Sequence, residues 1–362
     1  MDLLRRALRQ PQLWPAMSLA QWDLVVRQAR HADLLARLAA TARACGQADA
    51  LPPAVRLHAD SALMIAQRQH KELVHEVDQI RRALAPVGVP VVLLKGAAYV
   101  LQGLQAAQGR LVSDVDILVP RERLADVESA LMIAGWVSTH RDAYDQHYYR
   151  TWMHELPPLK HMSRGTALDV HHAILPPTTR LRPYSADLLS ATIAVGGHED
   201  VRTLSHLDMV LHSAAHLFHE SELPMGLRGL VDLDALLDEF SAEPGFWDAL
   251  LARAQRLRLE PSLAMALRYT ARLLGTPVPA DVSERLALRL REQGLTPRWG
   301  LMDALYGRAL LPQHSSTADA WTPLAHGLLY LRGHWLRMPP GLLARHLLRK
   351  ALLSPLARRS EG

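Results

Sequence analysis

The stretch LLKGAAYVLQGLQAAQGRLVSDVDILVP, residues 93–120, carries an unusual pair of charges inside an apolar segment. Asp114 and Asp116 stand one residue apart in a run whose other members, such as Val115 and Ile117, favour a β-strand. Successive side chains of a strand point to opposite faces and rise by about 3.3 Å, so the two carboxylates project together, about 7 Å apart. Because a charge removed from water is costly unless it is neutralised, this strand is either an exposed edge or a place where a cation binds.

Two carboxylates at this spacing can share divalent cations, which lie about 3.5 to 4 Å apart in two-metal sites. Magnesium suits such oxygen ligands, and manganese is the second candidate. A third carboxylate is expected on a neighbouring strand, where the segment LDVHH offers Asp169 between Leu168 and Val170. Since Leu168 and Val170 point to the opposite face, Asp169 can join Asp114 and Asp116 as a metal ligand.

The segment before the aspartates offers groups that bind phosphate. The run VVLL leads into Lys95, Gly96 and Ala97, where a helix is expected to begin. Glycine lets a phosphate approach the backbone, and the free N–H groups at a helix start attract anions. Lys95 adds a positive charge, and Arg110 presents a planar fork suited to phosphate oxygens. The competing interpretations are a solvated lysine and a structural salt bridge from Arg110 to Asp114 or another acid.

The chain divides into three expected domains. Residues 1–85 have apolar side chains at helical spacing, with helices expected over 21–46 and 54–84. Residues 86–204 alternate strands with helices, which predicts an α+β domain with a mixed sheet. Residues 205–362 return to successive amphipathic helices, which predicts a helical bundle. The strands of the central domain are expected at 91–94, 114–119, 136–140, 147–156 and 165–175, its helices at 96–104 and 121–135, and a linker within the bundle at 310–323.

Composition and charge narrow the function further. The 362 residues include one cysteine, Cys45, so neither a disulfide framework nor a cysteine cluster for a metal is available. We therefore expect the protein to be located in the reducing cytoplasm. The sequence has no apolar run of eighteen residues and no signal-peptide pattern, so no membrane span is expected. Residues 331–362 hold seven basic side chains and one acidic side chain, so their excess of positive charge is larger than the net charge of +5 of the whole chain. The nearly neutral remainder argues against nucleic acid as a substrate.

The basic tail, GLLARHLLRKALLSPLARR at residues 341–359, is amphipathic at helical period. A membrane surface, a nucleic acid and an acidic partner are its candidate ligands, and packing over the bundle is the structural alternative.

A competing metal site lies in the segment LSHLDMVLHSAAHLFHE. His212, His216 and His219 share one face of the expected helix, and neutral imidazole is a common metal ligand. Such a site would make the protein a metal phosphohydrolase, whereas packing of this helix against the α+β domain at 86–204 is the structural alternative.

The segments KGAA, GRLVSDVDILV and ALDVHH together resemble the signature of the DNA polymerase β-type nucleotidyltransferase superfamily, and most closely its bacterial branch of uncharacterised nucleotidyltransferases. In that superfamily a strand ends in glycine followed by Gly or Ser, the next strand carries Asp-x-Asp or Asp-x-Glu, and a later strand holds a third carboxylate. Two departures stand out: Ala97 offers no hydroxyl to a triphosphate, and seventeen residues separate Gly96 from Asp114, which is longer than usual. The likeness extends over about residues 55–350.

The resemblance implies transfer of a nucleoside monophosphate from an NTP donor to a hydroxyl or phosphate of an acceptor, with release of pyrophosphate. Asp114 and Asp116 would hold two magnesium ions, and Asp169 would complete the acceptor-side metal and help to deprotonate the attacking hydroxyl. The acceptor is expected to be a small molecule, a saccharide or a peptide. An inactive NTP-binding or scaffold protein of the same fold is the alternative. The nucleotide-binding residues are expected to be Lys95, Gly96, Ala97, Arg110, Ser113 and His171.

Overall fold

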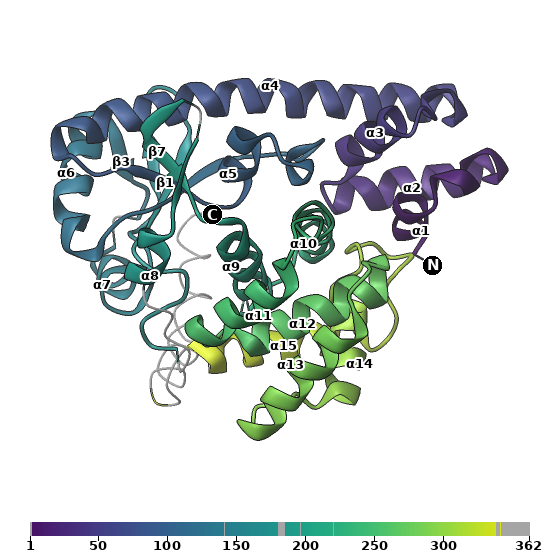
Figure 1. Ribbon diagram of the computed structural model, residues 1–362. Coiled ribbons are helices and arrows are strands. Elements are labelled where there is room, and N and C mark those ends of the chain that lie inside the picture. Colours follow the sequence, from purple (N-terminus) through teal and green to yellow (C-terminus); the bar gives the residue numbers. More distant parts are fainter. Residues whose placement is uncertain are drawn as a thin grey trace, which may run out of the picture.

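The computed structural model describes residues 2–140, 142–179, 185–195, 197–219 and 221–337, together with Gly341. Its centre is a seven-stranded mixed sheet with the order β3-β4-β5-β2-β1-β7-β6. Helices precede this segment of the chain and follow it, as Figure 1 shows. The α+β class with a mixed sheet, expected from the sequence, is confirmed. The basic tail at 341–359 lies outside the described residues, apart from Gly341.

The chain before the sheet is helical, as predicted, but one expected helix is wrong. The segment 21–46 forms two helices because the backbone turns at Asp33, whose φ of 54° is left-handed. Aspartate tolerates that conformation better than most residues, and the Asp33 carboxylate lies 3.1 Å from the Arg228 guanidinium. The elements are α1 (Leu3–Arg9), η1 (Pro11–Ala16), α2 (Leu19–His31), α3 (Leu35–Ala44), η2 (Ala48–Ala50), α4 (Pro53–Leu84) and η3 (Ala85–Val87).

The long helix α4 agrees with the prediction for 54–84. It begins with Pro53 in its first turn, where the fixed φ of proline suits a helix and no N–H is needed. Figure 1 shows it crossing the molecule, and it contacts α2 and α3 as well as β1, α5 and α6. The N-terminal helices are therefore tied to the sheet through α4.

The sheet segment contains more elements than the sequence pattern predicts. Strand β1 pairs with β2 antiparallel and with β7 parallel, while β2 pairs with β5 parallel. Strands β4, β6 and β7 are not predicted. The elements are β1 (Val91–Leu93), α5 (Lys95–Gln102), η4 (Gln105–Ala107), β2 (Asp114–Leu118), η5 (Arg121–Arg123), α6 (Leu124–Ile133), β3 (Trp136–Ser138), α7 (Ala143–Trp152), β4 (Leu159–His161), β5 (Ala167–His171), α8 (Ser185–Ser190), β6 (Ile193–Val195) and β7 (His198–Thr203).

The strand predicted over 147–156 is wrong, because most of that segment belongs to helix α7. Its aromatic residues favour strands by propensity, but tertiary contacts override such a preference. Arg150 lies one helical turn from Gln146 and donates to its side chain, and it also forms an ion pair at 2.6 Å with Glu128 of α6.

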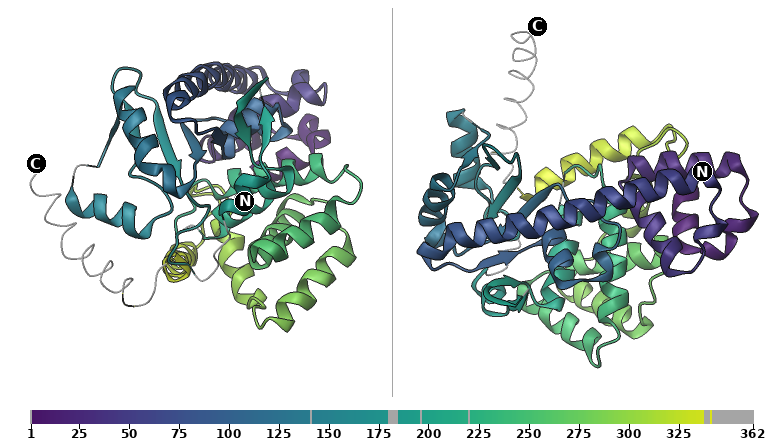
Figure 2. Two further views of the ribbon diagram at one scale, coloured as in Figure 1. Left: turned by 60° about the vertical axis from the view of Figure 1, so that its left-hand side comes forward. Right: turned by 90° about the horizontal axis from the view of Figure 1, so that it is seen from above.

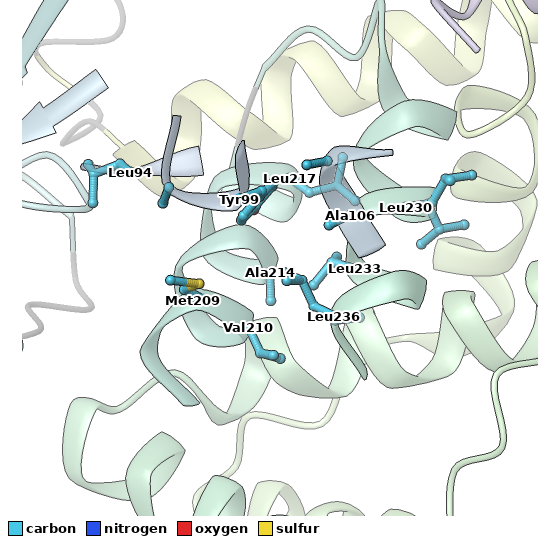
Figure 3. Packing of buried hydrophobic residues seen from close by; sticks show 14 of the residues in the cluster. Leu94, Tyr99, Ala106, Met209, Val210, Ala214, Leu217, Leu230, Leu233 and Leu236 are labelled. Carbon is cyan, nitrogen blue, oxygen red and sulfur yellow. The ribbon is translucent and has the colours of Figure 1, made fainter. Parts of the chain in front are cut away.

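Helices make up the rest of the described chain. Figure 3 shows Leu94, Tyr99 and Ala106 of the sheet segment together with buried side chains of α9 and α10, so the two segments share one core. The predicted linker, 310–323, joins α14 to α15. The elements are α9 (His206–His219), α10 (Gly226–Phe240), α11 (Phe246–Leu257), α12 (Glu260–Tyr269), the π-helix η6 (Thr270–Leu274), α13 (Ala280–Glu292), α14 (Trp299–Ala309) and α15 (Thr322–Arg337).

Candidate active site

Strands β2 and β5 bring three carboxylates to one cavity. The strands run parallel and in register, with Asp116 opposite Asp169. Asp114 precedes Asp116 by two residues and shares its face, while Val115 and Ile117 are buried on the other face. All three carboxylates line a cavity of about 430 Å³.

The cavity lies between the sheet segment and the helices that follow it. One wall comes from β2, β5 and the start of α5. The other wall comes from α9 and α10, through residues that include His216, Arg228 and Asp232. This volume falls in the range of small-molecule sites, about 300 to 1,000 Å³.

Lys95 neutralises Asp116. It stands at the first position of α5 with a left-handed φ of 47°, and its Nζ lies 2.8 Å from Asp116 Oδ1. Burial alone would lower the pKa of Lys95, but the neighbouring carboxylate raises it above its ordinary value. Burial alone would likewise raise the pKa of Asp116, but Lys95 and His171 hold it well below its ordinary value. Strained backbone of this kind occurs often at functional sites.

His171 lies between two carboxylates. Its Nε2 is 2.9 Å from Asp116 Oδ1, and its Nδ1 is 3.3 Å from Glu155 Oε2. Burial opposes the charged imidazolium, yet the bond to Asp116 and the charge of Glu155 raise the pKa of His171. Asp116 Oδ1 therefore meets both Lys95 and His171.

Asp169 has the opposite electrostatic environment. Burial raises its pKa to about 7, and the charges of Asp116 and Glu155 contribute in the same direction. The charge of His171 acts in the opposite direction, but the short contacts of Lys95 Nζ and His171 Nε2 are with Asp116 and not with Asp169. A carboxyl group that titrates near neutral pH can accept and release a proton there.

Arg110 is paired with an acid of the helical segment. Its Nε lies 2.8 Å from Asp232 Oδ2, and Arg37 of α3 lies 3.9 Å from the other carboxylate oxygen. The guanidinium also packs on Gly96, where an added Cβ would lie 2.2 Å from Arg110 Nη1. Arg110 and Gly96 both line the cavity. Arg110 can therefore form its salt bridge with Asp232 and still be reached by a ligand in the cavity.

The remaining predicted nucleotide-binding residues lie at the margin. Ala97 is buried in α5 and is not among the residues that line the cavity. Ser113 is exposed, and its hydroxyl donates to Asp114 Oδ1 at 3.3 Å. Of the two, only Ser113 therefore contacts a carboxylate of the site.

The three histidines of α9 do not form a metal site among the described residues. His216 lines the cavity, whereas the Nδ1 of His219 contacts the backbone oxygen of Ala215 in its own helix at 3.0 Å. Burial lowers the pKa of His212 to about 3 and that of His219 to about 4. These rings are neutral packing groups, so the phosphohydrolase hypothesis gains no support.

The sequence analysis did not identify His154 and Glu155 as site residues. They lie between α7 and β4, where Glu155 forms an isolated bridge with His171. Arg228 and Arg337, from α10 and α15, add two guanidinium groups to the cavity. The sequence feature that could have identified them is the adjacent pair of a histidine and a glutamate, His154 and Glu155. The wrong strand prediction for 147–156 assigned this pair to a strand instead.

Comparison with protein families assigns the chain to the nucleotidyltransferases, which are transferase enzymes. This class implies an NTP donor and an acceptor, and its members generally use divalent metal ions. The chain belongs to the family described as uncharacterised nucleotidyltransferase, whose model matches residues 18–275. The resemblance in the sequence is thus confirmed, although the match begins and ends earlier than 55–350. Neither the curated proteins nor the solved structures contain a match. Within the described ranges, every helix is too short or too polar to cross a membrane.

Proposed function

We propose that the protein transfers a nucleoside monophosphate from an NTP to a hydroxyl or phosphate of a small molecule, saccharide or peptide, with release of pyrophosphate. We also propose that its sheet segment is a polymerase β-like core. The observation that carries the proposal is the parallel register of β2 and β5, which sets Asp116 opposite Asp169 with Asp114 two residues away.

The residues at this wall fit magnesium. Three carboxylates form an oxygen donor set of the kind magnesium prefers, and the pKa of Asp169 is raised first by burial and then by the negative charges of Asp116 and Glu155, which a bound cation would offset. Asp114, Asp116 and Asp169 would hold two ions, with manganese as a substitute. Bound magnesium would supply positive charge to the triphosphate and to the leaving pyrophosphate.

The chain's own groups have distinct roles in this proposal. Lys95 keeps Asp116 ionised and provides an ammonium group at the wall where phosphate would lie. Arg110, held by Asp232 and packed on Gly96, presents its guanidinium at the cavity wall, where it can contact a phosphate group. The carboxylate of Asp169, at the same wall as Asp114 and Asp116, accepts the proton of the attacking hydroxyl as a general base.

The test uses each of the four α-labelled NTPs with and without MgCl₂, together with acceptors of the three chemical classes. Transfer of label should require the metal and should disappear in Asp114→Asn and Asp169→Asn. The matched control is Asp248→Asn, because Asp248 is an exposed aspartate on α11, with 72% of its side chain accessible. Unfolding midpoints measured with each nucleotide identify the donor, since a ligand of the native state raises stability by mass action. The proposal is wrong if no nucleotide stabilises the protein in the presence of magnesium.

A further inference from the structure

Three side chains beside the carboxylate wall present metal-binding atoms to one another. His154, Glu155 and His171 offer one ligand atom each, and these atoms lie within 4.8 Å of one another. His171 Nδ1 and Glu155 Oε2 are 3.3 Å apart, which is about the separation of two ligands in a tetrahedral zinc site with bonds of about 2.0 to 2.1 Å.

The two imidazoles also leave nitrogen atoms without hydrogen bonds. Nδ1 of His154 is buried and has no hydrogen-bond partner, whereas the buried Nδ1 of His171 makes no hydrogen bond but lies 3.3 Å from the Glu155 carboxylate. A buried polar atom without a partner costs free energy, so Nδ1 of His154, beside the contact of His171 with Glu155, indicates a missing ligand. The rings lie close together, with centroids 5.2 Å apart.

Asp116 orients one of the rings from behind. Because Asp116 Oδ1 lies 2.9 Å from His171 Nε2, this nitrogen can keep its proton while a metal ion replaces any proton on Nδ1, the nitrogen that faces Glu155. Histidine ligands of metals commonly donate their other N–H to a carboxylate in this way. The group therefore has an outer support as well as three inner ligands.

We propose that His154, Glu155 and His171 bind a zinc ion, separate from the magnesium ligands Asp114, Asp116 and Asp169. Two imidazoles and one carboxylate form a three-ligand zinc set that leaves a coordination position open to water or to an acceptor oxygen. The zinc site does not depend on the proposed transfer reaction, because binding is measured as metal content.

The full-length protein is stripped with a chelator, dialysed against ZnCl₂ and measured for zinc by elemental analysis, and Co²⁺ replaces zinc for absorption spectra. We expect about one zinc ion per chain in the wild-type protein. The affinity for zinc should be weakened more than about tenfold in His154→Gln and also in Glu155→Gln, which is the more conservative substitution. The matched control is His216→Gln, since His216 lines the same cavity from α9. Folding of each variant is checked by thermal unfolding.

The proposal is overturned if the wild-type protein retains no zinc, or if folded His154→Gln and His216→Gln retain the same amount. The proposal is also overturned if the protein loaded with Co²⁺ lacks the visible absorption bands of tetrahedral Co²⁺, because a site suited only to magnesium would not produce them. Because no nucleotide is present, none of these results depends on whether the protein transfers NMP.

A different observation concerns helix α15, whose outward face is apolar. Five large side chains at its surface are between 39% and 64% exposed, although surface helices normally turn polar residues to water. An exposed apolar patch of this kind marks an interface, and Figure 2 shows α15, in yellow, at the edge of the molecule. Four of the five belong to α15 itself and the fifth, Trp321, directly precedes it; the others are Leu324, Leu328, Leu331 and Trp335.

These residues form one stripe because their spacing alternates between three and four positions. The stripe is about 21 Å long and has a tryptophan at each end. The basic residues of the helix do not interrupt it: Arg332 donates to the backbone oxygen of Phe218 at 2.9 Å, and Arg337 contacts Ser221. Each exposed residue within α15 is uncharged.

The sequence that follows supplies positive charge. Residues 338–362 contain five basic side chains and one acid. Tryptophan and leucine on one face with basic residues nearby are typical of helices that lie in a membrane interface, and basic residues are attracted to anionic headgroups. A second copy of the chain would instead bring two basic segments together, which is unfavourable.

We propose that α15 and the basic sequence after it bind an anionic lipid surface, with the helix in the plane of the interface. The test is flotation of the full-length protein with vesicles of phosphatidylcholine, with and without phosphatidylglycerol. Binding should require the anionic lipid and should weaken at least about tenfold in Leu328→Gln/Leu331→Gln. The matched control is Leu57→Gln/Met64→Gln, which changes two exposed apolar residues of α4.

Neutralising Arg345, Arg349 and Lys350 with glutamine should reduce binding and its dependence on salt. The proposal fails if the protein does not bind anionic vesicles at low salt, or if the α15 variant and the α4 control bind equally. A change of oligomeric state in the α15 variant, measured by light scattering without lipid, would assign the face to a second copy instead.

Discussion

Replacing Lys95 by methionine tests the electrostatics of the site directly. The ammonium group lies 2.8 Å from Asp116 Oδ1, and only 6% of the Asp116 side chain is exposed. Removing one partner of a buried ion pair typically costs about 3 to 5 kcal/mol, because the other charge stays buried. His171 still donates to the same oxygen at 2.9 Å, so we expect the lower end, a loss of about 3 kcal/mol.

Magnesium should reverse part of this loss. With Lys95 present, a cation at Asp116 has to compete with the ammonium group at Oδ1, whereas in Lys95→Met only the hydrogen bond from His171 remains at that oxygen. A ligand at one hundred times its dissociation constant stabilises the native state by about 2.7 kcal/mol. At equal MgCl₂ concentration, the gain should therefore be larger for Lys95→Met than for the wild type.

The assay is urea unfolding at pH 7 with EDTA and with MgCl₂. Lys71→Met serves as the control, because Lys71 is an exposed lysine on α4. Equal stability of Lys95→Met and the wild type in EDTA would refute the ion-pair reasoning. Equal magnesium gains in the two proteins would refute the competition between Lys95 and the cation.

Three further predictions follow from buried groups. Gly96→Ala should displace Arg110, since the new Cβ would lie 2.2 Å from its Nη1, and unfolding should show a loss of about 3 kcal/mol; unchanged stability would mean that Arg110 moves freely. Asp232→Asn should cost a similar amount, and a double-mutant cycle with Arg110→Met should give a coupling of 1 to 3 kcal/mol, about what contacting residues show, whereas additive effects would exclude the pair. Burial lowers the pKa of His212 to about 3 and that of His219 to about 4, so below pH 6.5 these histidines bind protons in the unfolded chain but not in the folded chain. The free energy of unfolding should therefore fall by at least about 2 kcal/mol between pH 7 and pH 5.5. His219→Gln should reduce this fall by about 1 kcal/mol.

The period of two residues along a strand is enough to predict part of the site. It shows that Asp114 and Asp116 share a face and that Asp169, between apolar neighbours, belongs to a similar face. It does not fix which strands are neighbours. That choice depends on pairing across the sheet, where Asp116 meets Asp169 across a sequence separation of 53 residues.

The parts of the site that the sequence pattern does not predict depend on contacts between residues far apart in the sequence. Arg110 meets Asp232 across a separation of 122 residues, so no local signal identifies its partner. Glu155 reaches the site from a segment without regular secondary structure, through one bridge to His171. Propensity misplaced this segment because its aromatic residues are favourable in strands, while their environment here is a helix packed on α6.

The two walls of the cavity come from separate stretches of the chain, and this arrangement separates two kinds of evolutionary change. Substitutions on α9 and α10 can reshape the pocket for a different substrate while the β2–β5 pair stays intact. A one-residue slip of β5, by contrast, would turn Asp169 away and present Leu168 or Val170 in its place. Under the proposed function, acceptor choice can therefore change by substitution on the two helices more easily than the carboxylate chemistry can change.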